Sequence, residues 1–326
     1  MNKKLTALAV AAALATPVAA QAAGPKVYGV LNVYAAKFDN ANGGELRLDH
    51  NTSAIGVKGS MDLDHGLKGI YKLEFQADPT ERGGKAYTSG GTVKNAIIDR
   101  DQWLGLSSKE YGTVRIGTMS TSYKSSGKTV DPLYRTPLEG RGFLGIQSKL
   151  HSGAGPDRGR STNTVRYDSP RIAGAKVVAN YQLNEGASNT MGLGVHYKNG
   201  PIKAHFDYIN SGPKSATAMK FGGGYSMGDI NVGVQYEILD EALGYGGDIL
   251  FVNAAYTLGK TALILSWGSQ AESTSGANDD HTGLALAVDH KLAKKTDIYA
   301  GYGTTSGGSG YTGEDSVIAA GLRIKF

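Results

Sequence analysis

The sequence predicts an all-β protein, a 16-stranded antiparallel transmembrane β-barrel with short periplasmic turns at one rim and long extracellular loops at the other. Three observations predict this fold class. The chain begins with an export segment, most of the remainder alternates apolar and polar residues in stretches of about ten, and the stretches are joined by short and long connections in turn.

The first 22 residues have the composition of a secretory signal peptide. Two lysines near the start precede an apolar, alanine-rich run from Leu5 to Val18, and Ala20-Gln21-Ala22 has the small-x-small form of a cleavage site. We therefore expect a signal peptide at 1–22 and one mature domain at 23–326. An ordinary N-terminal helix is the alternative, but no helical pattern of that strength recurs.

Composition excludes several classes of protein. Removing the two lysines of the signal lowers the formal charge from +5 to 5 − 2 = +3, which does not indicate nucleic-acid binding. The chain has no Cys, so its stability cannot depend on disulfides. Beyond the signal no apolar run reaches 18 residues, so no membrane helix is expected. A count of 47 Gly and only 19% charged residues favours strands and turns.

The clearest alternation lies at the C-terminus. Ile318, Ala320, Leu322, Ile324 and Phe326 share one face, opposite Val317, Ala319, Gly321, Arg323 and Lys325. The same pattern places apolar faces at Ile230, Val232, Val234, Tyr236 and Ile238, at Met191, Leu193, Val195 and Tyr197, at Ile202, Ala204, Phe206 and Tyr208, and at Leu67, Gly69, Tyr71, Leu73 and Phe75. The two faces of each strand are therefore expected to meet different surroundings.

The connections set the number of strands. Tight turns are predicted at 64–66, 110–112, 172–174, 199–200, 228–229, 259–260 and 294–295, where Gly and Asn supply positive φ. Longer polar segments are predicted near 38–44, 78–95, 120–162, 184–189, 210–217, 240–247, 271–281 and 304–314. Seven short turns and eight long loops require 16 strands and leave both termini at the short-turn rim.

A membrane barrel explains this pattern better than a soluble β-sandwich does. Hydrocarbon offers backbone groups no hydrogen-bonding partner, so strands cross it only in a closed sheet without edges. A sandwich would instead bury the apolar faces of two sheets against each other. The signal peptide and the near-regular tight turns favour the barrel.

The polar faces predict a water-filled interior. Sixteen strands enclose an aqueous channel, whereas about eight enclose a packed core. Segment 120–162 is the longest break in the alternation. It either forms an exposed outer loop or folds into the lumen and narrows it. It contains, among other charged residues, Asp131, Arg135, Glu139, Arg141, Lys149 and Arg158.

Several phrases resemble the general porins of Gram-negative bacteria, in the same order along the chain. They are Ser53-Ala54-Ile55-Gly56-Val57-Lys58-Gly59, Gly66-Leu67-Lys68-Gly69, Gly112-Thr113-Val114-Arg115-Ile116-Gly117, Asn163-Thr164-Val165-Arg166-Tyr167-Asp168-Ser169-Pro170, Leu292-Ala293-Lys294-Lys295-Thr296-Asp297-Ile298-Tyr299 and the terminal Phe326. The resemblance implies an outer-membrane homotrimer with a separate pore in each subunit. It also implies that the third loop, here 120–162, folds inward as the constriction.

The same resemblance implies partners and pore residues. Expected partners are outer-membrane lipid and lipopolysaccharide, the barrel-assembly machinery through Phe326, and small hydrophilic solutes and ions. Arg100, Arg115 and Arg160 stand where such porins often place a basic ladder on the wall. Ala54 occupies a place where related anion-preferring porins can carry Arg, which is a departure from a full basic cluster.

Alternation tests some of these assignments. Arg115 lies between Val114 and Ile116, and Arg166 between Val165 and Tyr167, so both are predicted to face the lumen. Arg100 shares parity with Leu104 and Leu106, which points it at lipid, where an Arg costs about 2–4 kcal/mol at mid-membrane. Either a bulge shifts the register or Arg100 lies near the rim.

The predicted mechanism is electrostatic sieving. We expect a pore constriction formed by Arg100, Arg115, Arg160, Arg166, Lys58, Asp131 and Glu139. Bases on one wall would face Asp131 and Glu139 on the loop, and a narrow passage discriminates between ions where a wide one does not. More bases than acids are predicted on the inward faces, which indicates a weak preference for anions.

Three other functions remain open at this point. A substrate-specific porin would have an aromatic slide for sugars, and an adhesin would use its outer loops. A barrel hydrolase could use Ser226, since Gly224-Tyr225-Ser226-Met227-Gly228 has nucleophile-elbow spacing, although it lies at a hairpin. We expect no catalytic residues, cofactor or metal. Trp103, Trp267 and the 18 Tyr are expected in interfacial girdles or at the trimer contact.

Overall fold

The computed structural model describes residues 24–40, 43–80, 98–148, 150, 160–243, 247–271, 280–307 and 315–326. The expected signal peptide at 1–22 lies outside the described residues, as do Lys149 and Arg158 of the long central loop. Among the helices that are described, none is long and apolar enough to cross a membrane.

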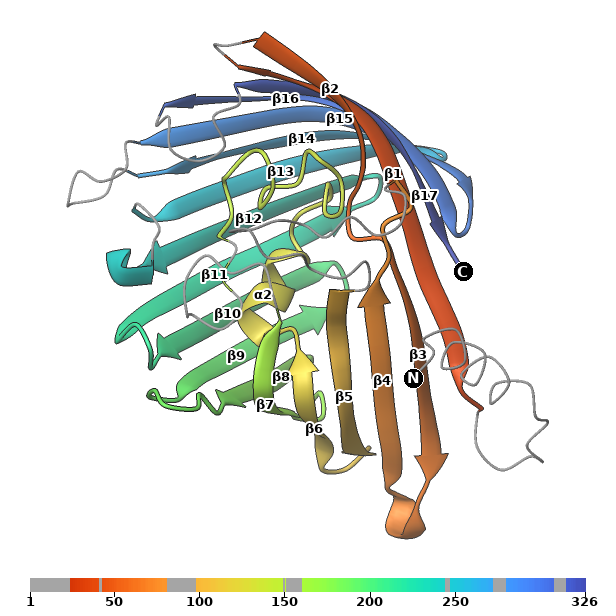
Figure 1. The fold of residues 1–326 in the computed structure, drawn as a ribbon, viewed down its shortest axis with the longest axis vertical. Helices are drawn as coiled ribbons and strands as arrows, with labels where there is room; N and C mark the ends of the chain where they lie inside the picture. The colour runs from red at the N-terminus through yellow and green to blue at the C-terminus, as the bar shows by residue number, and fades with distance from the viewer. Residues whose placement is uncertain are drawn as a thin grey trace, which may run out of the picture.

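Seventeen strand segments form one antiparallel sheet (Figure 1). They are β1 (Lys26–Asn40), β2 (Gly43–His50), β3 (Ala54–Asp62), β4 (Lys68–Gln76), β5 (Ile98–Ser108), β6 (Gly112–Met119), β7 (Ser161–Asp168), β8 (Ala175–Gln182), β9 (Thr190–Asn199), β10 (Ile202–Ser211), β11 (Ala216–Met227), β12 (Ile230–Leu239), β13 (Ile249–Leu258), β14 (Thr261–Gln270), β15 (His281–Ala293), β16 (Thr296–Gly307) and β17 (Ser316–Lys325). The described helices are short, namely η1 (Asp64–Gly66), α2 (Ser122–Gly127) and η2 (Glu241–Leu243).

The sheet closes into a barrel with 16 strand positions. Each strand from β3 to β17 pairs with the next, and β1 closes the ring by pairing with β17, as in Val33↔Leu322. The other edge of β1 pairs with β3 along residues 26–30 and with β2 along residues 33–40. Because β2 and β3 therefore occupy one position, the prediction of 16 strands is confirmed.

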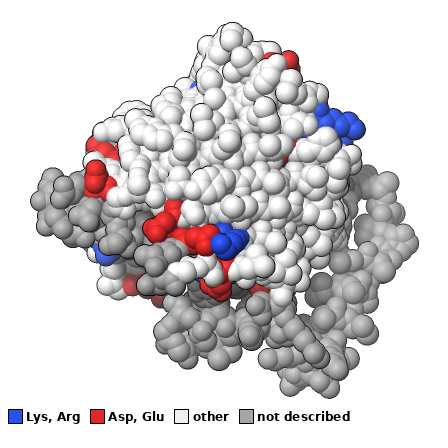
Figure 2. Space-filling view, turned by 90° about the horizontal axis from the view of Figure 1, so that it is seen from above, with Lys and Arg blue, Asp and Glu red and all other residues white. Residues whose placement is uncertain are grey.

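The two faces of the wall differ as the alternation predicts. On β17, Ile318 and Leu322 are exposed on the outside, whereas Val317 and Ala319 are buried on the inside. Seen from above, much of the surface carries no charged residue, and most of the visible Lys, Arg, Asp and Glu side chains lie in the left and lower parts of the view, one group of them near its middle (Figure 2). Such an uncharged band matches the hydrocarbon layer of a membrane.

The predicted connections hold with three corrections. All seven short turns join consecutive strand positions where they were expected. The connections expected at 38–44, 210–217 and 304–314 are shorter than predicted, because β1 continues to Asn40, β10 to Ser211 and β16 to Gly307. The strands extend there because their polar residues still find ladder partners, as in Asn40↔Gly43 and Ser211↔Ala216. Polarity alone therefore overestimates loop length at the outer rim.

The second strand position is interrupted at Asn51-Thr52-Ser53, which alternation places within a strand. Thr52 has φ 56°, a left-handed conformation that is unfavourable for a β-branched residue and ends the ladder. Side chains at this interruption bind the central loop. Asn32 donates to the carbonyl of Arg135, and Asn51 donates to that of Thr136 at 3.0 Å.

The described part of the central loop between β6 and β7, residues 120–148 and 150, crosses the inside of the barrel (Figure 1). Its apolar residues pack on the inner face of β13–β17 and β1, where the wall carries small side chains. The buried loop residues of this contact are Val130, Leu133, Leu138, Phe143, Leu144 and Ile146. The inward alternative for this segment is therefore the one that the fold adopts.

Candidate functional site

The base of the central loop is anchored to a buried carboxylate. Glu237 of β12 is 0% exposed and accepts hydrogen bonds from Tyr123 Oη at 2.8 Å and from the backbone N of Ser148 at 2.9 Å. Lys220 of β11 lies 3.5 Å from the same carboxylate and donates to the carbonyl of Tyr123 at 3.0 Å. One ion pair of the wall thus holds the loop at two points 25 residues apart in the sequence.

A second anchor joins α2 to β9 and β10. Ser122 donates to Asp207, and His196 Nε2 lies 3.1 Å from Ser122 Oγ and 3.1 Å from each Asp207 oxygen. A catalytic triad requires the two ring nitrogens of His to face the Ser and the Asp separately. Here one nitrogen faces both, and Ser122 is buried, so this cluster is an attachment and not a nucleophile.

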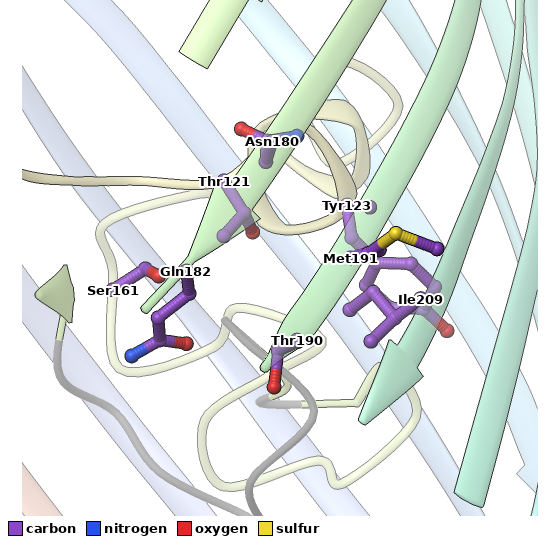
Figure 3. Close-up of a pocket in the computed structure, with 9 residues that line it drawn as sticks. Thr121, Tyr123, Ser161, Asn180, Gln182, Thr190, Met191 and Ile209 are labelled. Atoms are coloured by element: carbon purple, nitrogen blue, oxygen red, sulfur yellow. The ribbon is translucent and has the colours of Figure 1, made fainter. Parts of the chain in front are cut away.

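A small cavity lies between the start of the loop and the wall. Figure 3 shows Thr121 of the loop near Asn180 and Gln182 of β8, and Tyr123 beside Met191 and Ile209. The cavity volume of about 10 Å³ matches one water molecule. Both side-chain polar atoms of Asn180 are buried without a protein partner. We conclude that solutes do not pass behind the loop here.

The wall opposite the loop carries a network of alternating charges. Arg100 Nε lies 2.7 Å from Glu74, and Arg160 Nε lies 2.6 Å from Asp101. Lys72 bridges the two carboxylates at 3.0 and 2.7 Å. The structure thus brings the predicted site residues Arg100 and Arg160 together.

Arg100 faces the lumen because β5 bulges. In the ladder with β4, Gln102 opposes Leu73 but Asp99 opposes Phe75, so Arg100 and Asp101 together face the single residue Glu74. The extra residue moves Arg100 from the outer face to the inner face. Simple alternation, which pointed Arg100 at lipid, is therefore wrong for this residue, and the bulge is the reason.

A second cluster lies further along the same wall. Arg115 and Arg166 oppose each other on β6 and β7, and both contact Asp168, which also binds Lys176 at 2.9 Å. The Arg115 guanidinium lies 5.3 Å from the centre of the Trp103 ring. Trp103 thus lies inside the barrel, and the expectation that it belongs to an outer girdle is wrong, since its parity on β5 is opposite to that of Leu104.

The acidic residues that were expected to face the passage bind backbone N–H groups of the loop instead. Asp131 is buried and accepts from the backbone N of Leu133 and of Gly140, both at 2.9 Å. Glu139 accepts from the backbone N of Arg135 at 2.9 Å. Asp131 therefore does not face the passage, and it does not supply the acidic side of the expected field between a basic wall and an acidic loop.

The loop presents cations to the wall. Burial and the nearby charges of Arg160 and Arg141 lower the pKa of Lys124 well below its usual value. Arg135 and Arg141 flank Tyr134 at 5.5 and 4.9 Å from its ring. Although burial raises the pKa of Tyr134, these two arginines outweigh that effect and lower it. Lys128 is exposed beside them.

Positive charge therefore predominates at this level. Seven basic side chains stand against three carboxylates when the internally bonded Asp131 is set aside. The seven are Lys72, Arg100, Lys124, Lys128, Arg135, Arg141 and Arg160, and the three are Glu74, Asp101 and Glu139. Lys58 lies apart from them, exposed and 4.9 Å from the Tyr28 ring. We define the ten residues as the constriction cluster.

Sequence reasoning missed Lys124, Lys128 and Asp101. One available signal was Thr121 followed by a short polar run, because Thr121 caps α2 by accepting from the backbone N of Lys124 at 3.3 Å. A helix starting there places residues 124 and 128 one turn apart on the same side. The sequence already marks Asp101 as inward, because it shares its parity with Trp103 and is opposite in parity to Leu104.

Asp131 is expected to make ion selectivity depend on pH. Burial, together with the charge of Glu139, raises its pKa to about 7. Lowering the pH from 8 to 6 should protonate Asp131, remove a negative charge near the passage and increase the preference for anions. Asp131→Asn, which is neutral at every pH, should flatten this change in reversal-potential measurements in a salt gradient. An equal pH response of the variant and the parent would refute the assignment to Asp131.

The fold and the cluster together define a class of protein, the channel-forming barrels of the bacterial outer membrane. The chain belongs to the Gram-negative porin family, whose family description matches residues 7–309. It is 29% identical over 269 residues to the major outer membrane protein P.IB of Neisseria meningitidis serogroup B, covering 78% of this chain and 70% of that protein. It is 26% identical to the P.IB protein of Neisseria gonorrhoeae, with 100% of both chains covered.

Solved structures share the fold. The anion-selective porin from Comamonas acidovorans matches with a TM-score of 0.71 at 20% identity, covering 93% of this chain and 99% of that one. Salmonella typhi OmpF, solved with daunomycin, matches with a TM-score of 0.71 at 15% identity over 93% and 97% of the two chains. The trimer form of Vibrio cholerae OmpT matches with a TM-score of 0.66 at 18% identity over 94% and 100%. At these identities the likeness concerns the fold.

Proposed function

We propose that this outer-membrane porin is a water-filled channel for passive diffusion of ions and small hydrophilic solutes that prefers anions. The constriction cluster is the observation that carries the preference. Arg100 and Arg160 of the wall are balanced by carboxylates. Arg135 and Arg141 of the loop flank the ring of Tyr134 instead, and among the described residues neither they nor Lys128 forms an ion pair with a carboxylate. An excess of fixed positive charge in a narrow passage concentrates anions and repels cations.

Assembly and export extend the same proposal. We infer a homotrimer, supported by the trimer form of the Vibrio cholerae protein with the same fold. We also infer cleavage of 1–22 on export, contact with lipopolysaccharide, and recognition of Phe326 by the barrel-assembly machinery. Phe326 pairs with the backbone of Gly29 at the seam of the barrel, with N···O distances of 3.1 and 3.2 Å, and its side chain is exposed.

Two alternative functions lose support from particular contacts. A sugar slide requires free aromatic faces, but Arg115 covers the Trp103 ring and Arg135 and Arg141 flank Tyr134. A hydrolase based on Ser226 requires a base, but the Ser226 hydroxyl donates to Asn231 at 2.6 Å. We therefore propose that the chain has no enzymatic activity.

Planar-bilayer recording of the purified protein tests the proposal. In a KCl gradient the reversal potential should have the sign of anion preference, and a sugar should cause no saturable block. The preference should weaken at high salt, since the Debye length falls from about 10 Å at 0.1 M to about 3 Å at 1 M. A reversal potential of cation sign would contradict the preference, and silent membranes would contradict the channel itself.

A further inference from the structure

Two pairs of lysines lie near the short-turn rim, outside the constriction cluster. Lys26 of β1 is in register with Lys58 of β3, and Lys203 of β10 is in register with Lys198 of β9. Residues directly opposite each other on antiparallel strands have Cα atoms about 4.5–5.5 Å apart. Each pair therefore places two like charges side by side, an arrangement that destabilises a sheet.

Both pairs lie on the inner face of the wall. Lys26 shares its parity on β1 with Val30 and Asn32, which are buried inside the barrel. Lys203 shares its parity on β10 with His205 and Asp207, which are also buried inside. All four lysines are nonetheless exposed, because they lie close to the mouth of the lumen. The four ammonium groups are therefore accessible to solutes that enter or leave there.

The four lysines have no acidic partner within the described part of the chain, unlike their neighbours. Lys68 and Lys72, on the adjacent strand β4, and Lys176, on β8, all form ion pairs with carboxylates. Lys58 lies over the ring of Tyr28, a contact that orients its ammonium group without neutralising its charge. The like-charge pairs thus remain without a counterion from the wall.

The two pairs face each other across the barrel. Going around the ring, the five strands β4–β8 separate β3 from β9, and the seven strands β11–β17 separate β10 from β1. A solute at the centre of the mouth therefore has a lysine pair on each side. We call Lys26, Lys58, Lys198 and Lys203 the mouth lysines.

We propose that each pair of mouth lysines forms its own binding site for multivalent oxyanions at the periplasmic mouth of the channel. The ligand class follows from the donors, since paired ammonium groups bind phosphate oxygens as point charges and repay the like-charge cost only with an anion of more than one charge. The sites lie on the periplasmic side because short turns face the periplasm in such barrels. This proposal depends on the proposed function in one respect, namely that the lumen is open and filled with water.

Side-specific block of the current by pyrophosphate tests the sites. Channels of known orientation are recorded in 0.1 M KCl, with pyrophosphate added to one side at a time. Periplasmic pyrophosphate should reduce the current at lower concentrations than extracellular pyrophosphate, which reaches the sites only through the constriction. The block should be much weaker in 1 M KCl, where charges are screened beyond about 3 Å.

Matched variants locate the two sites. Replacing all four mouth lysines by Gln should raise the half-blocking concentration of pyrophosphate by about tenfold, since the two solvated charge contacts of a site contribute about 1.4 kcal/mol together. Lys198→Gln with Lys203→Gln, or Lys26→Gln with Lys58→Gln, leaves one site intact and should raise this concentration by about twofold. The control is Lys109→Gln with Lys260→Gln, which removes two charges from exposed turns of the same rim and should leave the half-blocking concentration close to that of the parent.

The outcomes separate these sites from the proposed function. Loss of the block in the fourfold variant with an unchanged reversal potential in KCl supports the mouth lysines as separate sites. An equal block in the parent and the fourfold variant, or an equal effect of the control, overturns the proposal. Anion preference without any block of the parent by pyrophosphate overturns the proposal alone, whereas absence of both also contradicts the selectivity assigned to the constriction cluster.

Discussion

Replacing Lys124 and Lys128 by glutamate is expected to abolish the anion preference of the channel. The two substitutions change the constriction cluster from seven basic and three acidic groups to five of each. The glutamate at 124 is tolerated, because Arg160, Arg141 and Arg100 act on that position with their positive charges. In a KCl gradient the reversal potential should therefore move close to zero.

Graded variants make this result interpretable. Lys124→Gln with Lys128→Gln should give an intermediate reversal potential, since it removes half as much charge. Lys109→Glu with Lys260→Glu makes the same change of charge on exposed turns and should leave the preference close to that of the parent. If the turn variant shifts the reversal potential as much as the loop variant, the selectivity belongs to the net charge of the barrel and not to the constriction.

Replacing Glu237 by leucine is expected to loosen the central loop and destabilise the barrel. Lys220, only 1% exposed, then loses its ion-pair partner, and Tyr123 and Ser148 lose their acceptor. Removing one partner of a buried ion pair costs about 3–5 kcal/mol. We expect a lower unfolding temperature, a larger single-channel conductance and a weaker preference for anions.

A double variant separates the two effects. Glu237→Leu with Lys220→Met removes the unpaired charge and should recover much of the stability, because an apolar pair often replaces a buried ion pair at little cost. It does not restore the hydrogen bonds to Tyr123 and Ser148, so the conductance should stay high. Glu185→Leu, on an exposed loop, is the control for a changed charge. An unaltered conductance in the Glu237 variants would show that this anchor does not position the loop.

The barrel itself could be predicted because every strand has one face toward lipid and one toward the lumen, and each face needs residues suited to its surroundings. Alternation such as Ile318 against Val317 survives in the structure, since the outer face meets lipid and the inner face meets the lumen. The tight turns predicted the number of strands, because a two-residue hairpin requires particular residues at its turn. Both signals are local in the sequence.

The site could be predicted only in part, because its decisive features are not local. The bulge that turns Arg100 inward depends on how β5 pairs with β4. The inward position of Trp103, in contrast, follows from its parity opposite to Leu104 and could have been read from the sequence. Asp131 carries a formal charge that suggested a role in the passage. Its orientation, however, depends on the backbone N–H groups of Leu133 and Gly140 after the loop has folded.

The interruption at Asn51-Thr52-Ser53 has a mechanical consequence. The central loop is held near its base by Glu237 and at its far turn by Asn32 and Asn51, so it is a beam supported at both ends and not a flap hinged at one. Bending a doubly supported beam requires breaking contacts at one end first. The open channel should therefore carry a quiet, steady current, with rare and complete closures instead of continuous flicker.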